Sequence, residues 1–135
     1  MPNRRDLFKL AAFQAMAGAA LAAKIPNSTM DKGQAKVTHE PFGDLHVYLD
    51  GSTDQLKAMT FGSLQLKPGA TPHPPHEHPE EEIMIITEGT GDITVDGKVT
   101  KVAPGTSMYC AAGKLHTIVN TGKTPLLFYY FKWKV

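Results

Sequence analysis

The chain has 135 residues, 41% of them hydrophobic, and a formal net charge of +1, so it is long enough for one folded domain and too apolar for a disordered tail. The near-neutral charge, without a basic run or stripe, argues against a nucleic-acid partner. The single cysteine, Cys110, excludes an internal disulfide and a zinc site built on cysteines. Twelve glycines and ten prolines indicate many turns, and therefore short strands.

Residues 1–23 differ in composition from the rest of the chain. Arg4, Arg5 and Lys9 give a positive start, and the apolar stretch of residues 10–23 is shorter than the roughly 20 residues that span a bilayer. This order predicts a signal peptide cleaved after Ala22 or Ala23, and residues 3–9 (NRRDLFK) resemble the twin-arginine export motif. We therefore expect a periplasmic or secreted protein with no membrane association after cleavage. An amphipathic or buried alanine-rich helix over residues 5–22 is the alternative.

The remaining chain reads as a linker followed by an all-β domain. Residues 24–36 are polar and rich in turn formers, and we interpret them as a linker to a domain of residues 37–135. Asp96-Gly97 between two apolar runs predicts a two-residue hairpin, and no segment of the domain has a helical period. The predicted strands cover residues 45–49, 56–66, 82–87, 92–95, 98–102, 107–110, 116–119 and 126–134. Their spacing predicts a sandwich or barrel.

The last predicted strand, residues 126–134, is apolar on both faces. One face is expected in the core, and the other either meets a second subunit in a homodimer or is covered within the monomer.

The histidines carry the chemistry of the sequence. In an extended chain the period of two places His76 and His78 on one face, with Glu77 facing away. The start of the next strand can bring Glu82 to the same face, and His116 is the candidate for a fourth ligand of a divalent ion. The alternative is that this proline-flanked loop is a solvated stretch without a metal.

Two motifs resemble the conserved boxes of the cupin superfamily. Gly69-(x)6-His76-x-His78-(x)3-Glu82-(x)6-Gly89 resembles the first box, and Ala112-Gly113-(x)2-His116-(x)3-Asn120, preceded by Val102-Ala103-Pro104-Gly105, resembles the second. This chain departs from the usual pattern in a gap between Gly69 and His76 that is one residue longer, and in Ala111 where proline is usual. The resemblance implies a small conical cupin-type β-barrel (jelly-roll) that is often dimeric, with His76, His78, Glu82 and His116 as ligands of one metal ion.

Three imidazoles and one carboxylate offer no thiolate. This donor set suits Mn, Fe, Ni, Cu or Zn, and the sequence does not choose among them. Four protein ligands leave open positions for a substrate oxygen or dioxygen on an octahedral ion, which would act as a Lewis acid or activate water. Glu82 is also the candidate catalytic base, besides its role as a ligand.

The expected pocket is apolar and lacks arginine. Arginine is the usual partner of carboxylate and phosphate, and the chain has none after the export signal, although Lys57, Lys67 and Lys114 can supply a charge. Six side chains are expected to face inward, as pocket wall or as ordinary core: Met59, Phe61, Met84, Ile86, Phe128 and Tyr130. Such a pocket suits a neutral phenolic, flavonol-like or β-dicarbonyl compound.

We therefore expect an exported metal-dependent cupin enzyme, a dioxygenase-like oxidoreductase acting on a small oxygen-chelating organic substrate. The alternatives are a non-catalytic periplasmic cupin that binds a metal or small ligand, and a metal-dependent lyase, isomerase or hydrolase.

Several other polar residues are expected to have structural roles. His39, His46, His73 and Glu80 are expected to be solvated, with His73 alternatively orienting a metal ligand. Cys110 is expected to be buried, with Tyr109 facing away from it, and Asn120 to bond its own backbone in a turn.

Overall fold

The computed structural model describes residues 23–135. Within this range the chain forms one 3-10 turn, η2 (Lys32–Gln34), and nine strands. The strands are β1 (Lys36–Glu40), β2 (Gly43–Gly51), β3 (Ala58–Leu66), β4 (Glu81–Glu88), β5 (Gly91–Val95), β6 (Lys98–Val102), β7 (Ser107–Cys110), β8 (His116–Asn120) and β9 (Leu126–Lys134). In this part of the chain no helix is long and apolar enough to cross a bilayer. Residues 1–22, which carry the predicted export signal, lie outside the described residues, so export stays a prediction.

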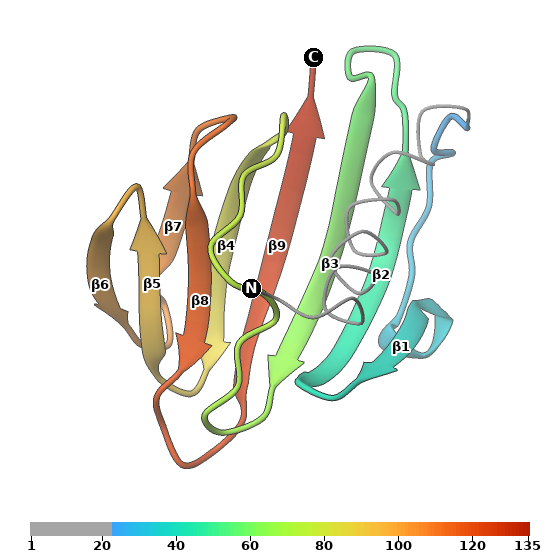
Figure 1. Cartoon of the computed structure of the whole chain (residues 1–135). Coiled ribbons are helices and arrows are strands. Elements are labelled where there is room, and N and C mark those ends of the chain that lie inside the picture. The colour runs from blue at the N-terminus through green and yellow to red at the C-terminus, as the bar shows by residue number, and fades with distance from the viewer. Residues whose placement is uncertain (1–22) are drawn as a thin grey trace.

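The strands form two antiparallel sheets that share one core. The larger sheet has the order β1-β2-β3-β9-β4-β7, and the smaller has the order β6-β5-β8 and stands at the β7 end of the larger one (Figure 1). The chain crosses from one sheet to the other between β4 and β5, at Gly89. Buried side chains from both sheets, such as Ile86, Ile118 and Phe128, belong to a single hydrophobic cluster. The predicted all-β jelly-roll is therefore confirmed.

The predicted strands agree closely with the observed ones. Strands β6, β7 and β9 have the predicted bounds, and the others begin and end within two residues of them. Asp96 and Gly97 both have positive φ, 51° and 83°, as the predicted two-residue hairpin requires. Strand β1 was not predicted because its sequence, KVTHE, holds one aliphatic residue and no buried one. Part of the predicted linker also packs on the domain, since the backbone N–H of Ile25 donates to Ser52 O at 2.8 Å.

The inward face of β3 differs from the prediction. The buried positions include Thr60 and Leu64, whereas Met59 and Phe61 have the opposite parity and lie on the outer face, where the Phe61 ring is 5.8 Å from that of Tyr48. The expectation that Met59 and Phe61 face inward was therefore wrong. Met84, Ile86, Phe128 and Tyr130 are buried on the inner face, as predicted.

The inner face of β3 carries a glycine where the neighbouring strand carries a large aromatic side chain. Gly62 pairs with Tyr130 of β9, and a Cβ at position 62 would lie 2.7 Å from the phenol oxygen and 2.4 Å from the carbonyl oxygen of His46. Any side chain larger than hydrogen would therefore collide with the backbone of β2. The end of the Tyr130 ring occupies the space beside Gly62.

Asn120 joins the two sheets. Its side chain is fully buried and its amide donates to Leu66 O at 3.0 Å, at the end of β3, and to Thr124 O at 2.9 Å. Its amide oxygen accepts from Gly122 N, which is the local turn bond that the sequence predicted. The bond to Leu66 crosses from the smaller sheet to the larger one. It joins residues that are 54 positions apart, so local sequence signals could not predict it.

Replacing Asn120 by alanine should destabilise the fold. Asn120→Ala removes these bonds and leaves a buried carbonyl oxygen without its donor, so we expect a loss of about 2–4 kcal/mol in the free energy of unfolding. Urea denaturation measures this loss. Thr121→Ala, at the exposed neighbouring position, is the control and should change the midpoint little. Equal midpoints for Asn120→Ala and the parent protein would contradict the assigned role.

Candidate metal centre

Two segments that are far apart in the sequence are joined at the site by backbone hydrogen bonds. His76 N donates to His116 O at 3.1 Å, and His116 N donates to His76 O at 2.9 Å, which fixes the histidine-rich loop against the start of β8. A third bond, from Gly113 N to His78 O at 2.9 Å, holds the turn before β8 to the same loop. The relative positions of the histidines are therefore set by the main chain.

Strand parity then decides which side chains enter the site. His76 and His78 are buried while Glu77 between them is exposed, as predicted. At the start of β4, Glu82 is 4% exposed, whereas Glu81 points outward and its carboxylate accepts from the Tyr109 hydroxyl at 2.6 Å. The choice of Glu82 over Glu81 as the inward carboxylate is therefore confirmed.

The structure brings the predicted residues together. The ligand atoms of His76, His78 and His116 all lie within 4.8 Å of one another, so the three histidines are positioned to hold a metal ion. Glu82 Oε1 lies 3.0 Å from His78 Nε2 and 3.5 Å from His116 Nε2. Glu82 therefore stands where a fourth ligand would, and its role as ligand and base stays a prediction.

Backbone carbonyls orient two of the rings. His78 Nδ1 donates to Glu80 O at 3.0 Å, and His116 Nδ1 donates to Lys114 O at 2.9 Å. In a neutral imidazole the other nitrogen then carries the lone pair, so both Nε2 atoms are in the form that binds a metal.

The donor set fits a divalent cation. The Nε2 atoms of His78 and His116 face one Glu82 carboxylate oxygen at 3.0 and 3.5 Å, and either a proton or a metal cation must lie between such atoms for the contacts to be favourable. Two donors bound at right angles, each about 2.1 Å from one ion, are about 3.0 Å apart, which is close to the spacing found here. The buried His116 Nε2 also makes no hydrogen bond within the described residues.

The electrostatics of the site favour an ionised Glu82 carboxylate and a neutral His76. Burial by itself raises the pKa of Glu82, but the imidazoles of His116 and His78 outweigh it and lower the pKa to about 2. For His116, the effect of burial is outweighed by the contact with Glu82, and the pKa is raised. Burial and the neighbouring His73 lower the pKa of His76 to about 2. At neutral pH the site therefore combines an ionised carboxylate with a neutral His76.

Two loop residues that were expected to be solvated are buried. His73 is 7% exposed and stacks on the His76 ring at a centroid distance of 3.4 Å. Its Nδ1 donates to Pro74 O at 2.8 Å, and its carbonyl accepts from the Thr117 hydroxyl at 2.8 Å. His73 therefore belongs to the wall of the site and stacks on His76, and the alternative role of orienting a metal ligand through a ring nitrogen stays a prediction.

Glu80 is also buried, with 9% exposure, and its carboxylate lies 3.3 Å from His78 Nδ1. The polar, proline-rich composition of the loop was misleading because the loop is held against β8. His39, by contrast, is exposed as predicted, and its Nδ1 lies 2.7 Å from a carboxylate oxygen of Asp44.

Cys110 is buried as expected, and its Sγ lies 3.5 Å from His116 Nδ1. Burial raises the pKa of the thiol, so it remains a neutral packing group behind the histidine. Tyr109 faces away from it and is 57% exposed, as predicted.

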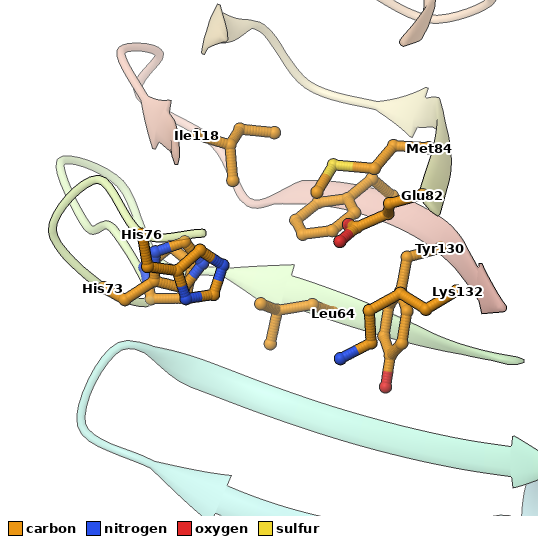
Figure 2. A pocket seen from close by; sticks show the side chains of 10 residues that line it. Leu64, His73, His76, Glu82, Met84, Ile118, Tyr130 and Lys132 are labelled. Carbon is orange, nitrogen blue, oxygen red and sulfur yellow. The ribbon is translucent and has the colours of Figure 1, made fainter. Parts of the chain in front are cut away.

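A pocket of about 300 Å³, its open mouth included, lies beside the site. Figure 2 shows His73 and His76 on one side of it and Tyr130 and Lys132 on the other. The wall is formed by Leu64, Pro72, His73, His76, Glu82, Met84, Ile118, Phe128, Tyr130 and Lys132. Lys57, Lys67 and Lys114 were predicted as possible partners for a charged ligand, but none of them lines this pocket. Lys132 was missed, although it shares the inward parity of Phe128 and Tyr130 in β9.

Metal binding should stabilise the protein through His116. We expect Mn, Fe, Ni or Zn added to metal-free protein to raise the melting temperature, because an ion that binds the folded state alone stabilises it. His116→Ala should abolish this rise, and His39→Ala, which changes an exposed histidine outside the site, should preserve it. Differential scanning fluorimetry measures both effects. An unchanged rise in His116→Ala would remove His116 from the ligand set.

Among curated proteins, the chain is similar to the oxalate-binding protein of Thermotoga maritima, with 29% identity over 105 residues, 78% of this chain and 80% of that protein. It is also similar to mannose-1-phosphate guanylyltransferase of Escherichia coli, with 28% identity over 88 residues. That match covers 65% of this chain and spans 17% of the length of the relative.

Solved structures show the same fold. A predicted oxalate decarboxylase from Thermotoga maritima superposes with a TM-score of 0.66 and 21% identity, over 80% of this chain and 100% of the other. An RmlC-like cupin from Shewanella frigidimarina superposes with a TM-score of 0.66 and 14% identity, over 82% of this chain and 93% of the other. The sequence profile of the cupin domain matches residues 62–131, more than half of the chain, and this segment runs from β3 through the histidine loop and β8 into β9. The chain therefore belongs to the cupin family.

Proposed function

We propose that this protein is a metal-dependent cupin that binds a small organic ligand through oxygen atoms at the metal, and that it acts as a dioxygenase-like oxidoreductase. The observation that carries the proposal is the convergence of His76, His78 and His116 with the Glu82 carboxylate beside a pocket that is otherwise mainly apolar. Mn, Fe, Ni, Cu and Zn all suit this donor set.

The roles of the protein groups follow from their positions. The metal, when bound, would supply Lewis acidity and open coordination positions for oxygen donors. Leu64, Met84 and Phe128 exclude water from one side of the pocket, and His73 holds the His76 ring in place by stacking. Glu82, whose low pKa keeps it ionised, would hold the ion; the same low pKa makes it a weak base, so its first role is that of a ligand.

The size of the pocket limits the ligand. The enclosed space is small, because the volume of about 300 Å³ includes the open mouth of the pocket. We therefore propose compact chelators, such as a β-dicarbonyl or a simple catechol, in preference to a three-ring flavonol.

A second candidate function is the binding or redox-neutral cleavage of a small dicarboxylate. The similarity to the Thermotoga oxalate-binding protein favours it, because the match covers most of both chains. In this case the protein would need no dioxygen.

Oxygen consumption separates the two candidates. With iron- or manganese-loaded protein and acetylacetone or catechol, we expect dioxygen uptake in proportion to the substrate consumed, measured with an oxygen electrode. His116→Ala should lower the rate by at least about a hundredfold. Replacing a residue that only hydrogen-bonds to a metal ligand typically lowers activity by about 10- to 100-fold, and removing a ligand itself should cost more. Absence of uptake with every loaded metal, together with anaerobic binding or cleavage of oxalate, would replace the oxidoreductase with the second candidate.

We further propose that the protein is a homodimer through the outer face of β4 and β7. Ile83 and Ile85 are each 43% exposed on this face, and Tyr109 of β7 lies beside them. Contiguous exposed apolar side chains on one sheet face are typical of subunit interfaces.

The oligomeric state tests this surface. Ile85→Lys should convert a dimer to a monomer because it buries a charge in the interface, whereas Val99→Lys, at a position 58% exposed on β6, should not. Light scattering coupled to size-exclusion chromatography gives the masses. A monomeric parent protein would contradict the proposal.

A further inference from the structure

A single layer of chain separates the pocket from solvent beside the candidate metal centre. This layer is formed by residues 71–75, which we call the strap. Pro72 and His73 belong to the wall of the pocket, whereas the two prolines that follow them are exposed. Figure 2 shows His73 at one side of the pocket. The strap lies within the gap between Gly69 and His76, where this chain has one residue more than the usual cupin motif.

Both ends of the strap are fixed to β8 by backbone hydrogen bonds. Before the strap, Gly69 N donates to Asn120 O at 2.9 Å, and Asn120 N donates to Ala70 O at 3.0 Å. After the strap, His76 and His116 exchange their two bonds at 3.1 and 2.9 Å. Paired main-chain bonds of this kind join neighbouring strands of a sheet, so the two ends are held as part of the fold.

The middle of the strap is tied to β8 through side-chain hydroxyls. The Thr117 hydroxyl donates to His73 O at 2.8 Å, and the Thr71 hydroxyl donates to the same oxygen at 3.0 Å. The two hydroxyl oxygens lie 3.2 Å apart. The prolines at positions 72, 74 and 75 have no N–H group to donate to a backbone ladder. Because water can replace bonds to neutral hydroxyls, this tie is easier to break than the paired bonds at the ends.

This arrangement allows the strap to open without separating the metal-ligand segments. When the hydroxyl bonds to His73 O break, the middle of the strap can move outward between two fixed points, while His76 and His116 stay paired. Opening is also required by size. The enclosed part of the pocket is small, so a chelating molecule needs a wider entrance to reach the metal.

We infer that the strap is a gate: residues 71–75 move away from β8 to admit a ligand to the metal, and the hydroxyls of Thr71 and Thr117 hold the closed form. This inference rests on the proposed metal centre and adds the route by which its ligand enters. A gate changes the rates of binding and release together and leaves the affinity of the closed site as it was. This property separates it from a group that contacts the ligand.

Removing one hydroxyl should speed ligand exchange. Thr117→Val keeps the branched shape of the side chain and removes the donor to His73 O. In cobalt-loaded protein we expect imidazole to bind and to leave about 2- to 10-fold faster, the effect of one neutral hydrogen bond on the population of the open form, with an unchanged Kd. Stopped-flow absorbance of the cobalt centre measures both rates. Thr94→Val, which removes the hydroxyl opposite Thr117 on β5, is the matched control and should leave both rates unchanged.

A reversible disulfide should lock the gate. In Thr71→Cys/Thr117→Cys, two thiols replace hydroxyls that are 3.2 Å apart, so diamide can oxidise them to a disulfide in the metal-free protein. After cobalt loading, imidazole exchange should be at least about tenfold slower than in the same protein reduced with a phosphine, because the strap cannot leave β8. The parent protein, whose one cysteine is buried, receives the same treatment as a control and should not respond.

Three results would contradict the gate. Unchanged imidazole rates in either Thr117→Val or the oxidised double variant would overturn it. A weaker imidazole affinity in Thr117→Val without faster association would also overturn it and assign Thr117 a positioning role. Failure of the parent protein to bind cobalt would overturn the metal centre itself, and the gate with it. Thr71→Val removes the other hydroxyl and takes the place of Thr117→Val if that variant fails to fold.

Discussion

The site depends on the pair of backbone hydrogen bonds between His76 and His116. These bonds join a loop that precedes β4 to the first residue of β8, which belongs to the other sheet. Without them, the two histidine-bearing segments would be separate loops at the mouth of the barrel. With them, the imidazoles converge before any ion arrives, so metal binding requires little ordering of the chain.

The second requirement is the inner face of the larger sheet. One row of side chains crosses three strands from Thr60 through Lys132 to Glu82, and the apolar residues of the pocket wall lie along the same inward faces. The sheet therefore places the Glu82 carboxylate and the side chain of Lys132 at one level of the inner face. Rigid strands hold such groups more precisely than loops do, which suits a site that must place a small chelating molecule.

The fold and the four convergent residues were predictable because they depend on periodicity and local signals. Alternation separated Glu82 from Glu81, and Asp96-Gly97 fixed a hairpin. The errors arose where tertiary contacts override local composition. His73 and Glu80 lie in a polar loop that is buried by its pairing with β8. In β3, the inner position beside Tyr130 is taken by Gly62, and Phe61 therefore has the outward parity. The sequence analysis did not place Lys132 in the pocket, because a charged residue near the end of an apolar strand is usually exposed to solvent.

The two rings that are oriented by carbonyl oxygens have a consequence for natural variation. Many metal-bound histidines depend on a neighbouring carboxylate side chain for their tautomer, and a single substitution there alters the centre. Here the acceptors are the main-chain oxygens of Glu80 and Lys114, which every amino acid possesses. The identities of these two residues can therefore drift during evolution while the lone pairs keep their direction, so sequence comparison would not reveal how the rings are oriented.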